Sequence, residues 1–151
     1  MINKDWNRQI VSGIVTHFYN GLNDNGIKAF YEGQDRDTNT VKEWAEIRLT
    51  EIYWEQIDAR TWVAELAVNI LCSAPSGEDA TDTAHDVYRI EDMLGICQSL
   101  FTVIRVDGLP CLVPGASTGR DIEQFRPRQV DTATNLVQAS VTGYYRLSIV
   151  M

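Results

Sequence analysis

One stretch of twelve residues, from Trp62 to Ser73, constrains the fold more than any other part of the chain. Its alternate positions form two sets of different character: Trp62, Ala64, Leu66, Val68, Ile70 and Cys72 are all apolar, whereas Val63, Glu65, Ala67, Asn69, Leu71 and Ser73 are mixed. Because successive side chains on a strand point to opposite faces of a sheet, this alternation predicts a long strand with one buried and one partly wet face. The mixed set is apolar enough that we expect it to be covered, by another subunit rather than by this chain.

A second alternating stretch runs from Val41 to Ile57, directly before the first. Its apolar phase slips around Thr50 to Tyr53, and a β-bulge, one extra residue in one strand, is the simplest cause. The connection over residues 58–60 is short enough for a hairpin turn. We therefore predict that Val41–Ile57 and Thr61–Ser73 pair as one long antiparallel hairpin.

Two stretches have the periodicity of amphipathic helices. The first covers Asp5–Asn20 and is expected to end at Asn20-Gly21, and the second covers Asp79–Leu100. Their apolar stripes are Trp6, Ile10, Ile14, Phe18 and Leu22 in the first, and Val87, Ile90, Leu94, Cys97 and Phe101 in the second. Gly95 lies within the second helix, and we expect it to permit close approach to the sheet.

The remaining segments complete an α+β fold. We expect strands at Ile27–Tyr31, Thr102–Val106, Asp121–Val130 and Leu136–Val150, a polar mobile loop at Glu32–Thr40, and a Gly/Pro loop at Asp107–Gly119 that is packed or bound to something. Hairpin connections dominate this order. We therefore predict one domain over residues 1–151, with a mostly antiparallel sheet and both helices on one face.

Composition limits the partners that such a domain can have. The chain of 151 residues has a net charge of -8, and the acids are concentrated in residues 74–102. An acidic surface repels phosphate, which argues against sequence-specific duplex binding. The acidic run is either a solvated helix face or a surface past which DNA must move without sticking. No apolar run is long enough to span a membrane and no signal segment is present, so we expect a soluble protein that is not secreted.

Residues with chemical potential are scattered. No nucleophile, phosphate-binding or metal-binding motif is present, so we expect no catalytic residues, no cofactor and no metal site. The three cysteines are expected to be reduced, with Cys72 and Cys97 buried. The features that could still carry chemistry are His17 on the first helix, Asp82, His85 and Asp86 on the second, the loop pair Asp35 and Asp37, the loop thiol Cys111, and a basic stripe of Arg120, Arg126, Arg128 and Arg146 for an acidic partner.

The layout resembles the tail terminator proteins of long-tailed bacteriophages, part of a broader group of tail-tube and neck ring proteins. The elements that carry the resemblance are the leading helix, the tryptophan-bearing strand Lys42–Leu49, the long strand ending in Val68–Cys72, the acidic helix after Pro75–Asp79 and the closing strand Val137–Leu147. These elements extend over nearly the whole chain, and no single motif among them is diagnostic.

The resemblance implies a structural protein of the virion tail or neck, made in the host cytoplasm. Such proteins form six-membered rings that cap the tail tube, end its polymerisation and present a surface to the head. The implied partners are further copies of this chain, the major tail tube protein, a head–tail connector and genomic DNA passing through the lumen, with no membrane involved. A head-completion or neck connector protein, a tail tube protein, and a small ligand-binding domain or enzyme remain alternatives. The loops Glu32–Thr40 and Asp107–Gly119 are the expected surfaces that meet neighbouring rings.

Overall fold

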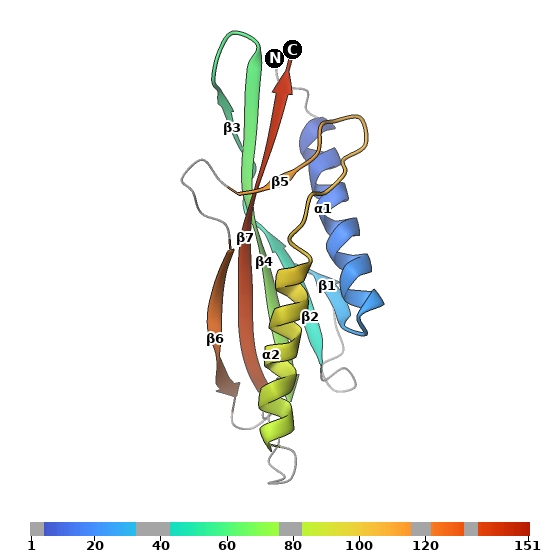
Figure 1. Ribbon diagram of the computed structural model, residues 1–151, viewed down its shortest axis with the longest axis vertical. Helices are drawn as coiled ribbons and strands as arrows, with labels where there is room; N and C mark the ends of the chain where they lie inside the picture. Colours follow the sequence, from blue (N-terminus) through green and yellow to red (C-terminus); the bar gives the residue numbers. More distant parts are fainter. Residues whose placement is uncertain (1–4, 33–42, 76–82, 116–121, 132–135) are drawn as a thin grey trace.

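The described residues form one seven-stranded sheet with two helices. The computed structural model describes residues 5–32, 43–75, 83–115, 122–131 and 136–151. The elements follow in the order α1 (Asp5–Asp24), β1 (Lys28–Tyr31), β2 (Trp44–Leu49), β3 (Tyr53–Gln56), β4 (Thr61–Pro75), α2 (Thr83–Ser99), β5 (Val113–Pro114), β6 (Ile122–Asp131) and β7 (Leu136–Val150). Figure 1 shows that β4 and β7 are the long central strands of the molecule.

The sheet is built around the pairing of β4 with β7. The strand order is β1-β2-β4-β7-β5, while β3 also pairs with β4 and β6 with β7. Among the strands of the described residues, β1 and β2 pair in parallel and the other pairings are antiparallel. The predicted α+β class and mostly antiparallel sheet are therefore confirmed.

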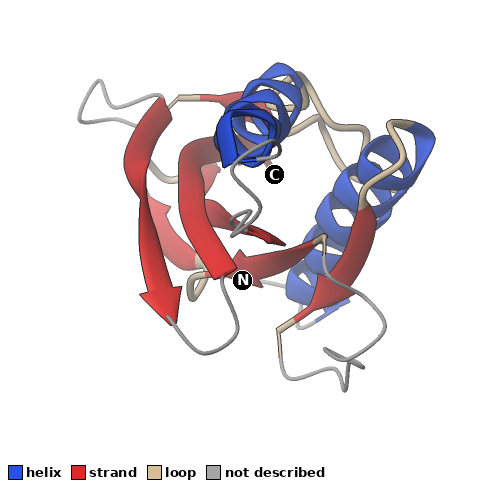
Figure 2. Cartoon of the chain, turned by 90° about the horizontal axis from the view of Figure 1, so that it is seen from below, coloured by secondary structure: helices blue, strands red, loops and turns tan. Residues whose placement is uncertain are grey.

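Both helices lie on the same face of the sheet (Figure 2). The side of β4 that carries Ala64, Val68 and Ile70 faces the helices, and these three side chains are fully buried. The matching side of β7 contributes Val141, Tyr145 and Leu147, all buried. The apolar alternate sets of both central strands thus lie on this buried face, and the expectation that both helices share one face is confirmed.

Helix α1 forms because its apolar residues recur at helical spacing. Four members of its predicted stripe, Ile10, Ile14, Phe18 and Leu22, are fully buried. The predicted end at Asn20-Gly21 is wrong, since the helix continues to Asp24. It ends in a Schellman motif: Gly26 adopts a φ of 76°, its N–H donates to the Asn23 carbonyl over 3.0 Å, and the Ile27 N–H donates to the Leu22 carbonyl over 2.9 Å.

The predicted long hairpin forms, and the bulge lies where the apolar phase slips. Leu49 pairs with Val68, but Tyr53 pairs with Glu65, so the β2–β3 side holds one extra residue. At the bulge the Thr50 hydroxyl accepts the Ala67 N–H over 2.8 Å, while the Thr50 N–H donates to the Ala67 carbonyl over 3.0 Å. The side-chain oxygen thus replaces a backbone carbonyl that the register shift has moved away.

We expect Thr50→Ala to lower the free energy of unfolding by about 1–2 kcal/mol, because the N–H of buried Ala67 loses its acceptor. Thr50→Ser keeps the hydroxyl and should lose less than about 0.5 kcal/mol. Urea unfolding of the two variants beside the parent measures both values. Equal losses in the two variants would assign the effect to the methyl group rather than to the hydrogen bond.

The turn between β3 and β4 is organised by Asp58. Its Oδ1 accepts the N–H groups of Arg60, over 2.8 Å, and Thr61, over 2.9 Å. The Ile57 N–H donates to the Thr61 carbonyl over 2.9 Å and closes the hairpin. The bond from the Arg60 N–H, followed by those from Thr61, lowers the pKa of the Asp58 carboxyl below its usual range. The predicted connection at residues 58–60 is therefore confirmed.

The lowered pKa makes the turn sensitive to acid. Because the folded chain favours the ionised carboxyl, Asp58 stabilises the fold above the ordinary aspartate pKa of about 3.9, and this contribution disappears as the pH falls through the lowered value. We expect the parent to be more stable than Asp58→Asn at pH 6 and the difference to vanish in the most acidic samples. Urea midpoints of both proteins across this range test it, and a constant difference would exclude titration of Asp58 as the cause.

Helix α2 carries the second predicted stripe, but its start differs. The structure assigns helix from Thr83, and residues 76–82 lie outside the described part of the chain. Ile90, Leu94 and Cys97 are buried as expected, and Met93 joins them, whereas the side chain of Val87 is not among those described. Gly95 is exposed, with nothing within 4 Å of an added Cβ, so the expected close approach to the sheet there is wrong.

The predicted strand at Thr102–Val106 is also wrong. Ile104 makes one isolated bridge to Leu112, and the remainder of the segment has no strand partner among the described residues. Its side chains nevertheless alternate between buried and exposed: Ile104 and Val106 are buried, while Val103 and Arg105 are exposed. The segment packs on α1 at Gly13, whose added Cβ would lie 3.2 Å from the Arg105 carbonyl oxygen.

Candidate functional site

The wetter face of the sheet carries a short ladder of polar side chains. Asn69 on β4 stands opposite Thr142 on β7, and its Nδ2 donates to Thr142 Oγ1 over 2.8 Å. Glu65 stands opposite Arg146, with Oε1 4.0 Å from the guanidinium Nε. These half-buried pairs fix the register of the two strands through hydrogen bonding and charge, and they contain no activated nucleophile.

The mixed set of β4 is covered more completely than expected. Within the single chain Val63 is 3%, Ala67 9% and Ser73 0% exposed, whereas Glu65, Asn69 and Leu71 are half-buried. The expectation that another subunit covers this face is therefore wrong for the first three, which are already buried without a partner.

Charge on this face also lies partly inside the fold. Glu46 on β2 is only 4% exposed, and its Oε1 accepts a hydrogen bond from Arg48 Nε over 2.7 Å. Both residues stand on the same side of β2, two positions apart. The pair neutralises a carboxylate that would otherwise be costly to bury.

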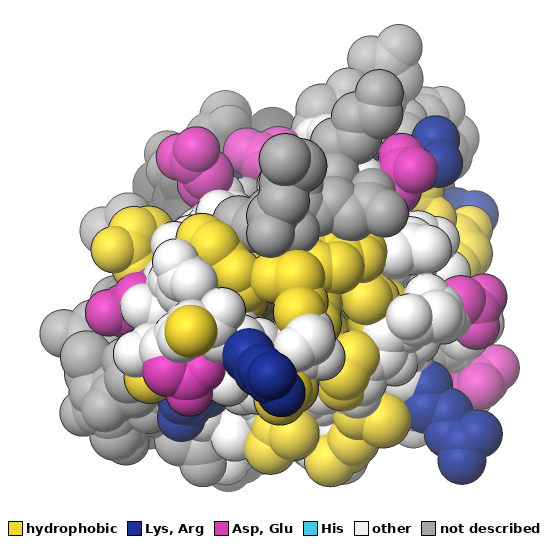
Figure 3. Space-filling model, turned by 90° about the horizontal axis from the view of Figure 1, so that it is seen from above, with side chains coloured by type: hydrophobic (Ala, Val, Ile, Leu, Met, Phe, Trp, Pro, Cys, Tyr) yellow, Lys and Arg dark blue, Asp and Glu magenta, His cyan; other side chains and the backbone are white. Residues whose placement is uncertain are grey.

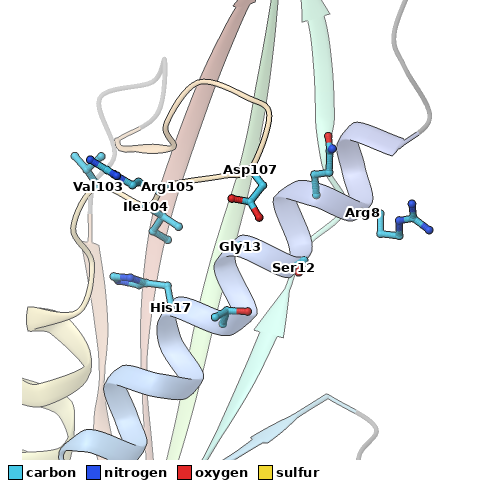
Figure 4. Close-up of a pocket in the computed structure, with 10 residues that line it drawn as sticks. Arg8, Ser12, Gly13, His17, Val103, Ile104, Arg105 and Asp107 are labelled. Carbon is cyan, nitrogen blue, oxygen red and sulfur yellow. The ribbon is translucent and has the colours of Figure 1, made fainter.

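A groove of about 820 Å³ runs between α1 and the segment at residues 103–107 (Figure 4). The residues that line it are Arg8, Gln9, Ser12, Gly13, Thr16, His17, Val103, Ile104, Arg105 and Asp107. At Gly13 the helix lies directly against the backbone of this segment, since an added Cβ would be 3.2 Å from the Arg105 carbonyl oxygen. Sequence reasoning missed it, since the segment was expected to be a strand of the sheet.

The polar groups of the groove do not converge on one point. In Figure 4, Arg8 and Arg105 lie at its opposite ends, with Asp107 between them. His17 donates through Nε2 to the Leu100 carbonyl over 2.7 Å, which fixes the imidazole against the chain after α2. His17 is half-buried, and this hydrogen bond gives its imidazole a structural role.

A smaller pocket of about 550 Å³ lies beside β5. It is lined by Pro110, Cys111, Val113, Pro114, Gly115, Arg146 and Ser148. The Gly/Pro loop is packed as predicted, since Leu112 is fully buried, and it presents the exposed Cys111 thiol at this pocket. Of the predicted basic stripe, only the Arg146 side chain is described: Arg120 lies outside the described residues, and the side chains of Arg126 and Arg128 are not among those described.

Other expected sites fall outside the described part of the chain. Asp35, Asp37 and Asp82 lie there, as does almost all of the loop Glu32–Thr40. His85 and Asp86 belong to α2, but their side chains are not described. Among the side chains that are described, no group of three or more His, Cys, Asp or Glu is placed to hold a metal ion.

One end of the molecule exposes apolar side chains. Ile57 after β3 is 55% exposed, Val150 at the end of β7 72% and Met151 47%. Two partly buried indoles lie near this end: Trp6 and Trp54 pack with ring centroids 5.6 Å apart. Viewed from above, hydrophobic side chains gather around a hollow in the middle of this end (Figure 3). We call Ile57, Val150 and Met151 the hydrophobic end.

Comparison with known proteins identifies a fold relative and no family. No family model matches the chain, and no curated protein matches it. One solved structure, whose name describes no function, superimposes with a TM-score of 0.58 over 93% of this chain and 94% of its own, at 12% identity. At that identity the likeness concerns the fold alone. Within the described residues, no helix is both long and apolar enough to cross a membrane.

Proposed function

We propose that this protein is a structural component of a long-tailed bacteriophage virion. In this proposal it assembles with itself into a closed six-membered ring that caps the tail tube, ends tube polymerisation and joins the tail to the head. The observation that carries the proposal is the succession of α1, the tryptophan-bearing β2, the long β4, α2 and the long β7 within one sheet. These are the elements on which the resemblance to tail terminator proteins rests.

The edges of the sheet support ring formation. In the described chain β1 pairs only with β2 and β6 pairs only with β7, so each leaves one strand edge open, at opposite sides of the sheet. A closed ring needs two different surfaces on each subunit that meet head to tail. Open strand edges provide unpaired backbone donors and acceptors for such a contact.

The hydrophobic end supports contact with a second kind of protein. Ile57, Val150 and Met151 are exposed together where the β3–β4 turn and the end of β7 meet, and the Met151 N–H donates to the Arg60 carbonyl over 2.7 Å. Exposed apolar residues gathered at one place commonly mark a protein contact. In the proposed ring this end meets the tail tube or the neck, and genomic DNA passes through the lumen without sequence-specific binding.

Two other roles are alternatives to the tail terminator. A head-completion, neck connector or tail tube protein would use the same sheet edges and the same hydrophobic end. A small ligand-binding domain would use the groove between α1 and residues 103–107, which is large enough for a small molecule. The ligand-binding role would be favoured if the purified protein bound a small metabolite at this groove and loss of the gene left phage tails unchanged.

The decisive experiment is removal of the gene from the phage that encodes it. We expect tails of irregular length that are not joined to heads, seen by negative-stain microscopy, with wild-type tails restored by the gene supplied on a plasmid. Normal tails joined to heads would refute the proposal. Normal tails that remain separate from heads would favour the neck connector, and missing tails would favour the tube protein.

A matched pair of variants tests the hydrophobic end. Ile57 and Val103 are each 55% exposed, but only Ile57 belongs to this end. Ile57→Asp is expected to fold and fail to restore tails in the deletion strain, whereas Val103→Asp restores them. Restoration by both variants would remove the hydrophobic end from the proposed assembly contact.

A further inference from the structure

Two thiols from distant parts of the chain meet inside the core. Cys72 lies on β4 and Cys97 on α2, 25 residues apart in the sequence, with their Sγ atoms 3.4 Å apart. Both side chains are fully buried and both cysteines are free. Figure 2 shows α2 lying against the sheet at whose centre β4 runs.

The two sulfur atoms lie at hydrogen-bond distance, and a covalent bond needs a small further approach. A disulfide has an S–S length of about 2.05 Å, so the two sulfurs need to approach by only about 1.4 Å. The sulfurs already face each other, since one thiol hydrogen-bonds to the other. The third cysteine, Cys111, is exposed on the loop before β5 and cannot replace either member.

We propose that Cys72 and Cys97 are an oxidation site that forms an intramolecular disulfide between β4 and α2. The oxidant is a small peroxide. One thiol gives its electron pair to hydrogen peroxide and becomes a sulfenic acid with release of water, and the second thiol then displaces its hydroxyl as a second water. In sum, two thiols and one peroxide give one disulfide and two waters.

Burial makes this reaction slow in the folded protein. The hydrogen bond with Cys72, together with burial, raises the pKa of the Cys97 thiol far above its usual range. Because the thiolate is the reactive form, oxidation requires local opening of α2 or long exposure to the oxidant. The exposed Cys111 is expected to react first, so it must be removed before the pair can be followed.

The disulfide would constrain the unfolded chain and attach α2 to the centre of the sheet. For a loop of this length, the loss of chain entropy corresponds to a rise in Tm of about 10 °C in a domain of this size. Reducing cell interiors keep such thiols free, whereas proteins outside cells meet oxidants. The inference concerns this core alone and is independent of the proposed ring.

The experiment uses the full chain carrying Cys111→Ser. Incubation with hydrogen peroxide, without reductant, is followed by intact mass, by peptide mapping without reduction, and by Tm. The expected product has lost two hydrogen atoms, gives one cross-linked peptide that contains Cys72 and Cys97, and has the raised Tm, which returns to its starting value with dithiothreitol.

Two further variants act as controls in the same background. Cys97→Ala and Cys72→Ala each leave one buried thiol and should show neither the mass loss nor the raised Tm. Addition of oxygen atoms without cross-linking would overturn the proposal, as would a disulfide that forms only in fully unfolded protein. A cross-link that lowers Tm would equally overturn it, because the native core would then not accommodate the bond.

Discussion

Gly143→Ala is expected to lower the free energy of unfolding by about 3 kcal/mol. A Cβ at this position of β7 would lie 2.2 Å from both Cδ1 and Cε1 of Phe101, far inside van der Waals contact. The ring cannot simply retreat, because it packs against Phe18 at 4.9 Å and Tyr145 at 5.9 Å between centroids. Urea unfolding measures the loss.

Two further variants show whether this contact is the cause. Gly95→Ala adds the same methyl group to exposed α2, where nothing lies within 4 Å, and should stabilise the protein by up to about 1 kcal/mol. In a Phe101→Leu background, the cost of Gly143→Ala should fall by at least about 1 kcal/mol, because the facing group is smaller and more flexible. If Gly143→Ala cost the same free energy of unfolding in that background, the loss would come from the backbone of β7 rather than from contact with the ring.

This glycine also shows where sequence reasoning ends. The alternation in Leu136–Val150 predicted that position 143 lies on the buried face of the strand, and it does. The aromatic ring that fills the space above it comes from a residue after α2, and local periodicity contains no information about that partner. For the same reason Gly95 was expected to approach the sheet, whereas Gly13 and Gly21 of α1 are the helical glycines that make close contacts.

Elements defined by their own residues were predicted well. The faces of β4 and β7, the stripe of α1, the turn at Asp58 and the bulge at Thr50 each depend on neighbours close in the sequence. The segment Thr102–Val106 was misread because its alternation is that of a strand, but the chain packs it against α1. Long-range packing decided its structure.

The cysteine pair and the proposed contact surfaces show the same difference between local and long-range information. The burial of Cys72 and Cys97 was predictable, because each belongs to an apolar set of its own element. The contact between the two thiols was not predictable, since it depends on where α2 crosses β4. A protein that works through contacts between whole surfaces, as we propose here, spreads its function over strand edges and exposed apolar residues. Such features have no short motif, which is why the sequence alone provided no residue for a site.

Phe18→Ala is the second variant from which we expect a large loss, about 3–5 kcal/mol. Phe18 on α1 is fully buried and packs against Phe101 and Tyr145, at 4.9 and 6.3 Å between ring centroids. It therefore joins α1 to the segment that follows α2 and to the central strand β7. Removing the ring leaves a cavity that these rigid neighbours cannot close.

Val11→Ala is the matched control on the same helix, since Val11 is 37% exposed, and its effect should stay within about 0.5 kcal/mol. Tyr145→Phe separates packing from hydrogen bonding, because it keeps the ring but removes the hydroxyl that donates to the Thr102 carbonyl over 2.8 Å, at a cost of about 1 kcal/mol. If Phe18→Ala cost no more than Tyr145→Phe, α1 would be held mainly by its other contacts. A cost near the upper value would instead make this aromatic cluster the principal attachment of α1 to the sheet.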